Sequence, residues 1–262
     1  MNDAVRPQRR AVLAGGLAVA TTAVLAGCSS TDGSGPAKAV SAGTPSPAAS
    51  PNAAPPAARP ATARAAYARL LEGNERWVKG TPQHPDQNPA RRAALAPEQK
   101  PYGVVVSCID SRVPPELVFD TGIGDLFVIR TGGQVVQPVV AGSAEYGPLT
   151  AGSPLIVVLG HQNCGAIKAA YKELKSGGRL PGDLQSIVEA LRPAYREIAK
   201  VKHADPVDAM IRAHANRTAA DLRSSDVLAP LVKKGELTVV SAYYSLDTGR
   251  VETLAGAPSG VR

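Results

Sequence analysis

Hydrophobic residues gather into short runs that are separated by longer amphipathic stretches. Four runs are nearly continuous in Val, Ile and Leu, and they lie at 103–107, 126–130, 155–160 and 237–243. Such runs are typical of strands that a parallel sheet buries on both faces. Apolar residues at helical spacing fill the intervals, at 143–149, 166–175, 184–200 and 206–224. The alternation predicts a single α/β domain, in which helices flank a mostly parallel central sheet of about four to five strands.

A further helix is predicted where this domain begins. From Thr62, apolar side chains such as Tyr67, Leu70 and Leu71 recur at roughly helical spacing, with charged residues between them. A loop rich in Pro, Gln and Asn follows, and a short helix is expected at 90–95. We therefore assign the folded domain to residues 62–262.

The first 27 residues have the pattern of an export signal. Arg9 and Arg10 precede an uncharged apolar run, 11–27, whose length of about 17 residues is short for a membrane span. The paired arginines resemble a twin-arginine signal, and Leu25-Ala-Gly-Cys28 resembles a bacterial lipobox, in which the cysteine is lipidated. We predict a lipid anchor on Cys28 at the extracytoplasmic face of the cell membrane; an uncleaved membrane anchor is the alternative.

Residues 28–61 are expected to form a tether between the anchor and the domain. Ala, Pro, Ser and Gly dominate this segment, and Val40 is its only large aliphatic residue. Such a composition buries too little apolar surface to offset chain entropy, so the tether is predicted to be disordered.

The charge of the chain argues against nucleic acid as a partner. Lys and Arg number 29 against 22 for Asp and Glu, a formal net charge of +7. Cleavage after residue 27 removes Arg6, Arg9, Arg10 and Asp3 and leaves +5. No stripe of Lys and Arg with interleaved aromatic residues stands out, so we expect a solvated basic surface rather than a nucleic-acid interface.

Three side chains that favour zinc fall at the ends of two predicted strands. Cys108 follows the first strand, and His161 and Cys164 follow the third. Because ligands gather at the carboxyl ends of parallel strands, we expect the three to meet at one edge of the sheet. Two cysteines and a histidine form a three-ligand zinc set with an open fourth position, which is the catalytic type of site. A Cys108–Cys164 disulfide is the alternative outside the cytoplasm.

Two charged residues follow the first of these ligands. Zinc held by two thiolates should acidify water less than a tris-histidine site does, so a second group is needed to hold the bound hydroxide. Asp110 can accept its hydrogen, and Arg112 can keep Asp110 ionised through a bidentate pair. A surface ion pair that contributes little is the alternative.

These motifs resemble, in order and spacing, the β-class carbonic anhydrases. The matching segments extend over about residues 65–255 and are 70–77, 108–116, 124–130, 145–146, 160–166 and 244–251. The resemblance implies one zinc per subunit on Cys108, His161 and Cys164, with Asp110 and Arg112 as the catalytic dyad. It further implies attack of zinc-bound hydroxide on carbon dioxide to give bicarbonate, and a homodimer or higher homo-oligomer.

The resemblance also implies a substrate pocket. Gln99 matches the plant-type glutamine of the family, and Phe127 and Tyr146 match its pocket aromatics, with core packing as their alternative role. Together they favour the subgroup in which the zinc keeps a water rather than being capped by the aspartate. Ile109, which replaces the usual serine, and the segment 132–134 depart from the family pattern.

Two other functions stay open. Relatives on this scaffold hydrolyse carbon disulfide or carbonyl sulfide, and nothing in the motifs separates these reactions. A non-catalytic zinc-binding envelope protein would be expected to have a damaged dyad or pocket, which this sequence does not show. No shuttle histidine is evident, since His84, His203 and His214 lie outside the motifs and are expected at the surface.

Overall fold

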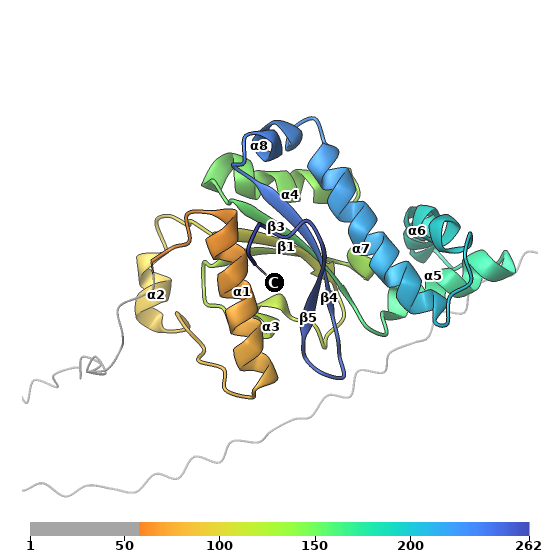
Figure 1. Cartoon of the computed structure of the whole chain (residues 1–262), viewed down its shortest axis with the longest axis horizontal. Helices are drawn as coiled ribbons and strands as arrows, with labels where there is room; N and C mark the ends of the chain where they lie inside the picture. The colour runs from red at the N-terminus through yellow and green to blue at the C-terminus, as the bar shows by residue number, and fades with distance from the viewer. Residues whose placement is uncertain (1–57, 262) are drawn as a thin grey trace, which may run out of the picture. The chain divides into compact units, whose positions relative to one another are not determined.

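A five-stranded sheet in the order β2-β1-β3-β4-β5 forms the centre of the computed structural model, which describes residues 58–261 (Figure 1). Its strands are β1 (Gly103–Cys108), β2 (Leu126–Thr131), β3 (Leu155–His161), β4 (Thr238–Tyr244) and β5 (Val251–Ala255). The first four run parallel, and β5 pairs with β4 in the antiparallel direction. Every residue of β1 and β3 is buried, as expected of central strands in a covered parallel sheet. The predicted α/β class is confirmed.

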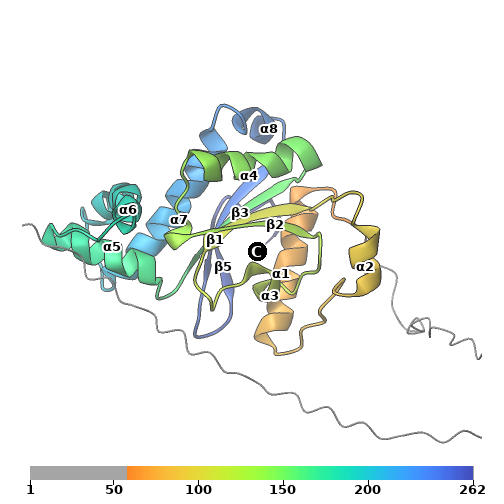
Figure 2. The same cartoon turned by 180° about the vertical axis from the view of Figure 1, so that it is seen from behind.

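Helices cover both faces of this sheet (Figures 1 and 2). On one face, α1 (Ala63–Val78) and α3 (Pro115–Val118) share a core with alternate residues of β1, β3 and β4. On the other face, α4 (Pro138–Ala151) and α7 (Pro206–Ser224) contact the strands directly. The remaining helices are α2 (Pro89–Ala94), η1 (Gly132–Gln134), α5 (Gly165–Ser176), α6 (Leu184–Ile198) and α8 (Ala229–Lys233). No helix among residues 58–261 is long and apolar enough to cross a membrane.

Side-chain caps explain where two of the predicted helices begin. The Thr62 hydroxyl accepts from the amide of Ala65 at 3.2 Å and starts α1. The Asp205 carboxylate accepts from the amides of Val207 and Asp208 and starts α7. Such caps satisfy amides that have no partner within the helix. The predicted extent of α7, 206–224, is confirmed, as is the predicted start of the first helix at Thr62.

Helix α4 is longer than the segment predicted from the sequence, 143–149. Two glycines and an internal proline, Pro148, lower its helix propensity, so the pattern hides its full extent. Gly147 is required for packing, because a Cβ there would lie 2.4 Å from Val104 of β1. The helix therefore lies directly on β1 and β2, and contact with the sheet outweighs the local propensity.

The export signal at 1–27 lies outside the described residues, as does the tether at 28–61 except for its last four residues. Those four were predicted to be disordered, but Pro60 is buried and Arg59 donates to the carbonyls of Lys100 and Pro101 at 2.8 Å and 2.9 Å. The C-terminal strand β5 was suggested only by the family resemblance, because its residues are half-buried and form no continuous apolar run.

Candidate metal centre

Cys108, His161 and Cys164 meet at the carboxyl edge of the sheet. β1 ends at Cys108 and β3 ends at His161, and the parallel pairing of Ser107 with Leu159 sets the two strand ends side by side. The three donor atoms lie within 4.8 Å of one another, and all three residues are buried. The structure thus brings together the three residues that the strand ends predicted.

A tight turn between β3 and α5 presents two of these residues. Asn163 has φ of +54°, in the left-handed region that asparagine adopts more readily than most residues. Cys164 then occupies the N-cap position of α5. Because the turn holds only two residues between the ligands, His161 and Cys164 both face Cys108.

The two thiols are free and lie against each other. Their sulfur atoms are 3.8 Å apart, and no disulfide joins them. The interaction with Cys164, assisted by His161 and the Gly133 amide, lowers the pKa of Cys108. The interaction with Cys108 and burial raise the pKa of Cys164. Two buried thiolates repel each other, so this pair favours a divalent cation between them.

The histidine is oriented for metal binding. His161 Nδ1 lies 2.9 Å from the carbonyl oxygen of Gln162, whereas its buried Nε2 has no hydrogen-bond partner within residues 58–261. A neutral imidazole that donates from Nδ1 leaves the Nε2 lone pair for a metal. Two thiols and this nitrogen form a donor set that fits zinc and leaves a fourth position open.

Asp110 and Arg112 form a bidentate ion pair beside the cluster. Arg112 Nε donates to Asp110 Oδ1 at 2.9 Å, and Arg112 Nη2 donates to Asp110 Oδ2 at 2.7 Å. The hydrogen bonds from Arg112 lower the pKa of Asp110 to about 2. Asp110 Oδ2 lies 3.9 Å from His161 Nε2, so an ionised carboxylate is next to the metal ligands.

Arg130 supports the same segment from β2, and the sequence reasoning assigned it no role. Its Nε donates to the Cys108 carbonyl at 2.9 Å, and its Nη2 donates to the Asp110 carbonyl. The guanidinium therefore fixes the backbone between the ligand and the carboxylate. The signal in the sequence was that Arg130 ends the predicted strand 126–130; in the structure it pairs with Ser107 of β1.

The three predicted pocket residues do not reach the cluster within one chain. Phe127 pairs with Val104, four residues before Cys108, and its ring packs edge-on against Tyr146 at 5.7 Å between centroids. Gln99 precedes β1 and is exposed. All three therefore lie toward the amino ends of the strands, whereas the ligands lie at the carboxyl ends.

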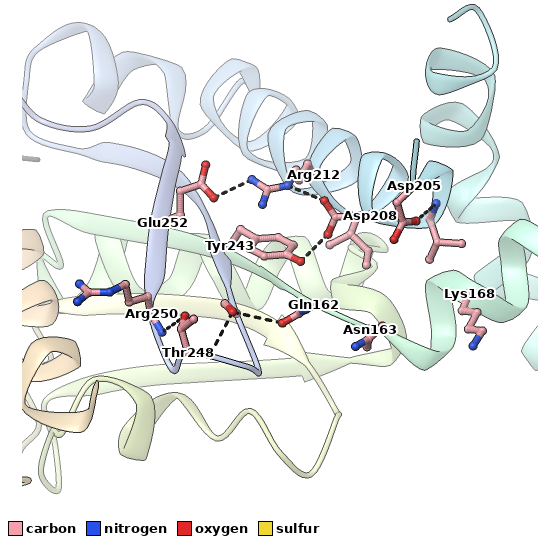
Figure 3. A pocket seen from close by; sticks show the side chains of 13 residues that line it. Gln162, Asn163, Lys168, Asp205, Asp208, Arg212, Tyr243, Thr248, Arg250 and Glu252 are labelled. Carbon is pink, nitrogen blue, oxygen red and sulfur yellow. Dashed lines mark hydrogen bonds and ion pairs between the residues drawn. The ribbon is translucent and has the colours of Figure 1, made fainter. Parts of the chain in front are cut away.

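A cleft adjoins the metal turn, and none of the three ligand residues lines it (Figure 3). It has a volume of about 810 Å³ and lies between the turn residues Gln162 and Asn163, the start of α7 and the β4–β5 hairpin. Arg212 crosses it, donating to Asp208 and to Glu252 at 2.8 Å each. The charges in the cleft largely compensate one another.

His214 is not at the surface, and that prediction was wrong. The residue is 6% exposed on the inner side of α7, and burial lowers its pKa to about 4. Met210, Thr218 and Leu222 are buried at the same four-residue spacing. This periodicity was the signal in the sequence that could have identified His214 as a core residue.

Comparisons with known proteins agree on one family. The carbonic anhydrase family model matches residues 103–251. The chain is 42% identical over 187 residues to carbonic anhydrase 2 of Mycobacterium tuberculosis, which covers 71% of this chain and 90% of that protein. It is 42% identical over 189 residues to the carbonic anhydrase of Mycolicibacterium smegmatis, and the match covers 72% of this chain and 91% of that protein.

Solved structures show the same fold. A tetrameric β-carbonic anhydrase from the filamentous ascomycete Sordaria macrospora has a TM-score of 0.58 at 22% identity, covering 74% of this chain and 98% of that one. The Coccomyxa β-carbonic anhydrase has a TM-score of 0.56 at 25% identity, and the match covers 71% of this chain and 84% of that one.

Proposed function

The chain belongs to the β-class carbonic anhydrase family, and we propose that it interconverts carbon dioxide and bicarbonate at the centre formed by Cys108, His161 and Cys164. The matched family segment, 103–251, includes all three ligands together with Asp110 and Arg112. The observation that carries the proposal is the meeting of three buried zinc-type donors with an ionised carboxylate, 3.9 Å from His161 Nε2.

The donor set would hold one zinc ion per subunit, since residues 58–261 contain a single cluster of this kind. Cys108 and Cys164 would bind it as thiolates, and His161 would bind it through Nε2. Zinc, when bound, supplies a Lewis acid that makes water nucleophilic at neutral pH.

Asp110 would orient the attacking oxygen. Because Arg112 occupies both carboxylate oxygens and keeps them ionised, Asp110 acts as an acceptor and not as a donor. An O–H group that donates to Asp110 turns its lone pair toward the substrate carbon. Arg112 thus acts through Asp110, as a positioning residue.

A second copy of the chain would complete the substrate pocket. Gln99, Phe127 and Tyr146 lie far along the strands from the ligands of their own chain, and Tyr146 is 52% exposed. β2 is an edge strand, and Val139 and Leu149 of α4 expose further apolar surface beside it. An exposed edge next to apolar side chains favours pairing with a second copy. We infer a homodimer whose pocket is of the plant type.

Export and anchoring remain proposals from the sequence. The twin-arginine-like signal at 1–27 and the lipobox ending at Cys28 support a lipid-anchored form outside the cytoplasm, with 28–61 as tether. The Thr62 cap starts the first helix, but Arg59 already donates to the carbonyls of Lys100 and Pro101, so the folded domain begins before residue 62. Mass spectrometry of the mature N-terminus tests the anchoring, because a diacylated Cys28 is expected and an intact Met1 would contradict it.

A paired assay tests the reaction itself. Stopped-flow measurements of carbon dioxide hydration and of carbon disulfide hydrolysis should be made on the same zinc-loaded preparation. We expect rapid hydration and little hydrolysis. The reverse result would assign the chain to the hydrolases on this scaffold, and the absence of both would favour a non-catalytic zinc protein.

A further inference from the structure

Gln162, which lies between two ligands, ties the metal turn to the hairpin that joins β4 and β5. Its Nε2 donates to Asp247 Oδ2 at 2.6 Å. Its Oε1 accepts from the Asp247 amide and from the Ser245 hydroxyl, at 3.2 Å each. Figure 3 shows Gln162 reaching toward the hairpin end that carries Thr248 and Arg250. The side chain is thus held at both ends of its amide and is not free for a ligand.

The backbone of the same residue contacts the histidine ligand. The Gln162 carbonyl lies 2.9 Å from His161 Nδ1, and this bond selects the tautomer that leaves Nε2 available to a metal. The direction of this carbonyl is set by the peptide between Gln162 and Asn163. Because that peptide lies in a turn outside the strand ladder, rotating it would cost no sheet hydrogen bond, yet it would release His161.

The hairpin is a firm support because α1 holds it from the other side. Asn74 is buried, donates to the Gly249 carbonyl at 2.8 Å and accepts from the Val251 amide at 2.8 Å. Trp77 Nε1 donates to the Tyr244 hydroxyl at 3.0 Å. The hairpin is therefore held by α1 on one side and contacts Gln162 of the metal turn on the other. This contact gives a role to segment 244–251, which resembles the family.

We propose that Gln162, through Asp247 and Ser245, is a positioning residue that keeps the Gln162 carbonyl against His161 and thereby sets the affinity of the metal centre. The inference rests on the zinc site of the proposed function. It predicts that the side chain of Gln162 affects metal binding although it contacts neither metal nor substrate.

The first test measures metal affinity directly. In Gln162→Ala, zinc affinity determined by competition with a chelator should fall about 10- to 100-fold, the usual effect of removing a group that orients a ligand. The absorption of the cobalt-substituted protein should weaken or shift, because the imidazole is less well oriented. Gln185→Ala is the matched control, since Gln185 also donates to a carboxylate, Glu189, at 2.6 Å but lies on α6. It should leave both readouts unchanged.

A rescue experiment separates positioning from a general loss of stability. Gln162→Glu places a carboxylate against Asp247 and should weaken zinc binding at least as much as Gln162→Ala. Adding Asp247→Asn reverses donor and acceptor between the two side chains and should restore affinity to within about threefold. Circular dichroism confirms that each variant is folded.

The outcomes distinguish this inference from the proposed function. Normal zinc binding by the unmodified chain with unchanged affinity in folded Gln162→Ala and Gln162→Glu would overturn the inference alone. Failure of the double variant to recover, with both single variants impaired, would also overturn it, because the Gln162–Asp247 contact would not be the cause. An unmodified chain that binds no zinc would overturn the proposed function and the inference together.

Discussion

Arg112 donates two hydrogen bonds to Asp110, of 2.9 Å and 2.7 Å, and Asp110 Oδ2 lies 3.9 Å from His161 Nε2 in the buried Cys108–His161–Cys164 cluster. The guanidinium is half-exposed, whereas the carboxylate side chain is mostly covered. The pair therefore differs from an ordinary surface ion pair, because its carboxylate faces the metal ligands. This geometry fixes an acceptor where the proposed reaction needs one.

Asp110→Asn should lower the turnover of carbon dioxide by about 100-fold or more, since the amide presents a donor where the reaction needs an acceptor. Zinc content should be unchanged, because Asp110 is not among the ligands. Stopped-flow hydration and metal analysis on the same sample measure both. Normal turnover in the variant would remove Asp110 from the mechanism.

Arg112→Lys should lower turnover by about tenfold, because an ammonium group cannot form the bidentate pair that fixes both carboxylate oxygens. Because lysine keeps the positive charge, any loss of turnover is due to the lost bidentate geometry. Steady-state measurements of kcat and KM for hydration check this, and kcat is expected to fall. A variant with unchanged kcat would show that positive charge alone suffices.

Val139→Asp should dissociate the proposed homodimer, since Val139 is 79% exposed on α4, the helix that contacts the edge strand β2. Sedimentation velocity should detect a monomer, and turnover should fall with it because the second copy no longer supplies pocket residues. Val201→Asp is the control, as Val201 is 67% exposed on a loop away from β2. A dimeric Val139→Asp protein would place the interface elsewhere.

Acid should destabilise the fold through His214. Burial lowers its pKa to about 4 in the folded chain, against about 6.5 when unfolded. The unfolded state thus binds more protons than the folded state between these two pH values. The free energy of unfolding therefore decreases as pH falls below about 6.5. From pH 7 to pH 5 the loss is on the order of 2 kcal/mol.

Urea unfolding of the unmodified chain and of His214→Gln at both pH values measures this effect. The free energy of unfolding should fall less with acid in the variant. Equal falls in the two proteins would show that His214 does not carry the acid sensitivity.

The sequence predicted the metal cluster because its members depend on chain topology alone. Cys108 and His161 end strands that any parallel α/β sheet would bring to one edge, and Cys164 follows by a short turn. The supporting contacts were not predictable in this way. The Gln162–Asp247 hydrogen bond joins residues 85 positions apart, and it depends on the position of the hairpin, which Asn74 of α1 helps to hold.

The pocket residues show a different limit. Phe127 and Tyr146 were each matched to a pocket aromatic, and the structure shows that the two rings pack edge-on. Their distance from the ligands of the same chain depends on strand register and is visible only in the structure. The sequence pattern alone cannot say which copy of a chain supplies a residue to a site.

The central claim is that Cys108, His161 and Cys164 hold a zinc ion that is required for carbon dioxide hydration. Its most direct test is to titrate the metal-free chain with zinc while measuring hydration and bound metal in the same sample. Activity should rise in proportion to bound zinc and reach a plateau at one ion per chain. Full hydration activity in the metal-free chain, or one tightly bound zinc without activity, would contradict the account.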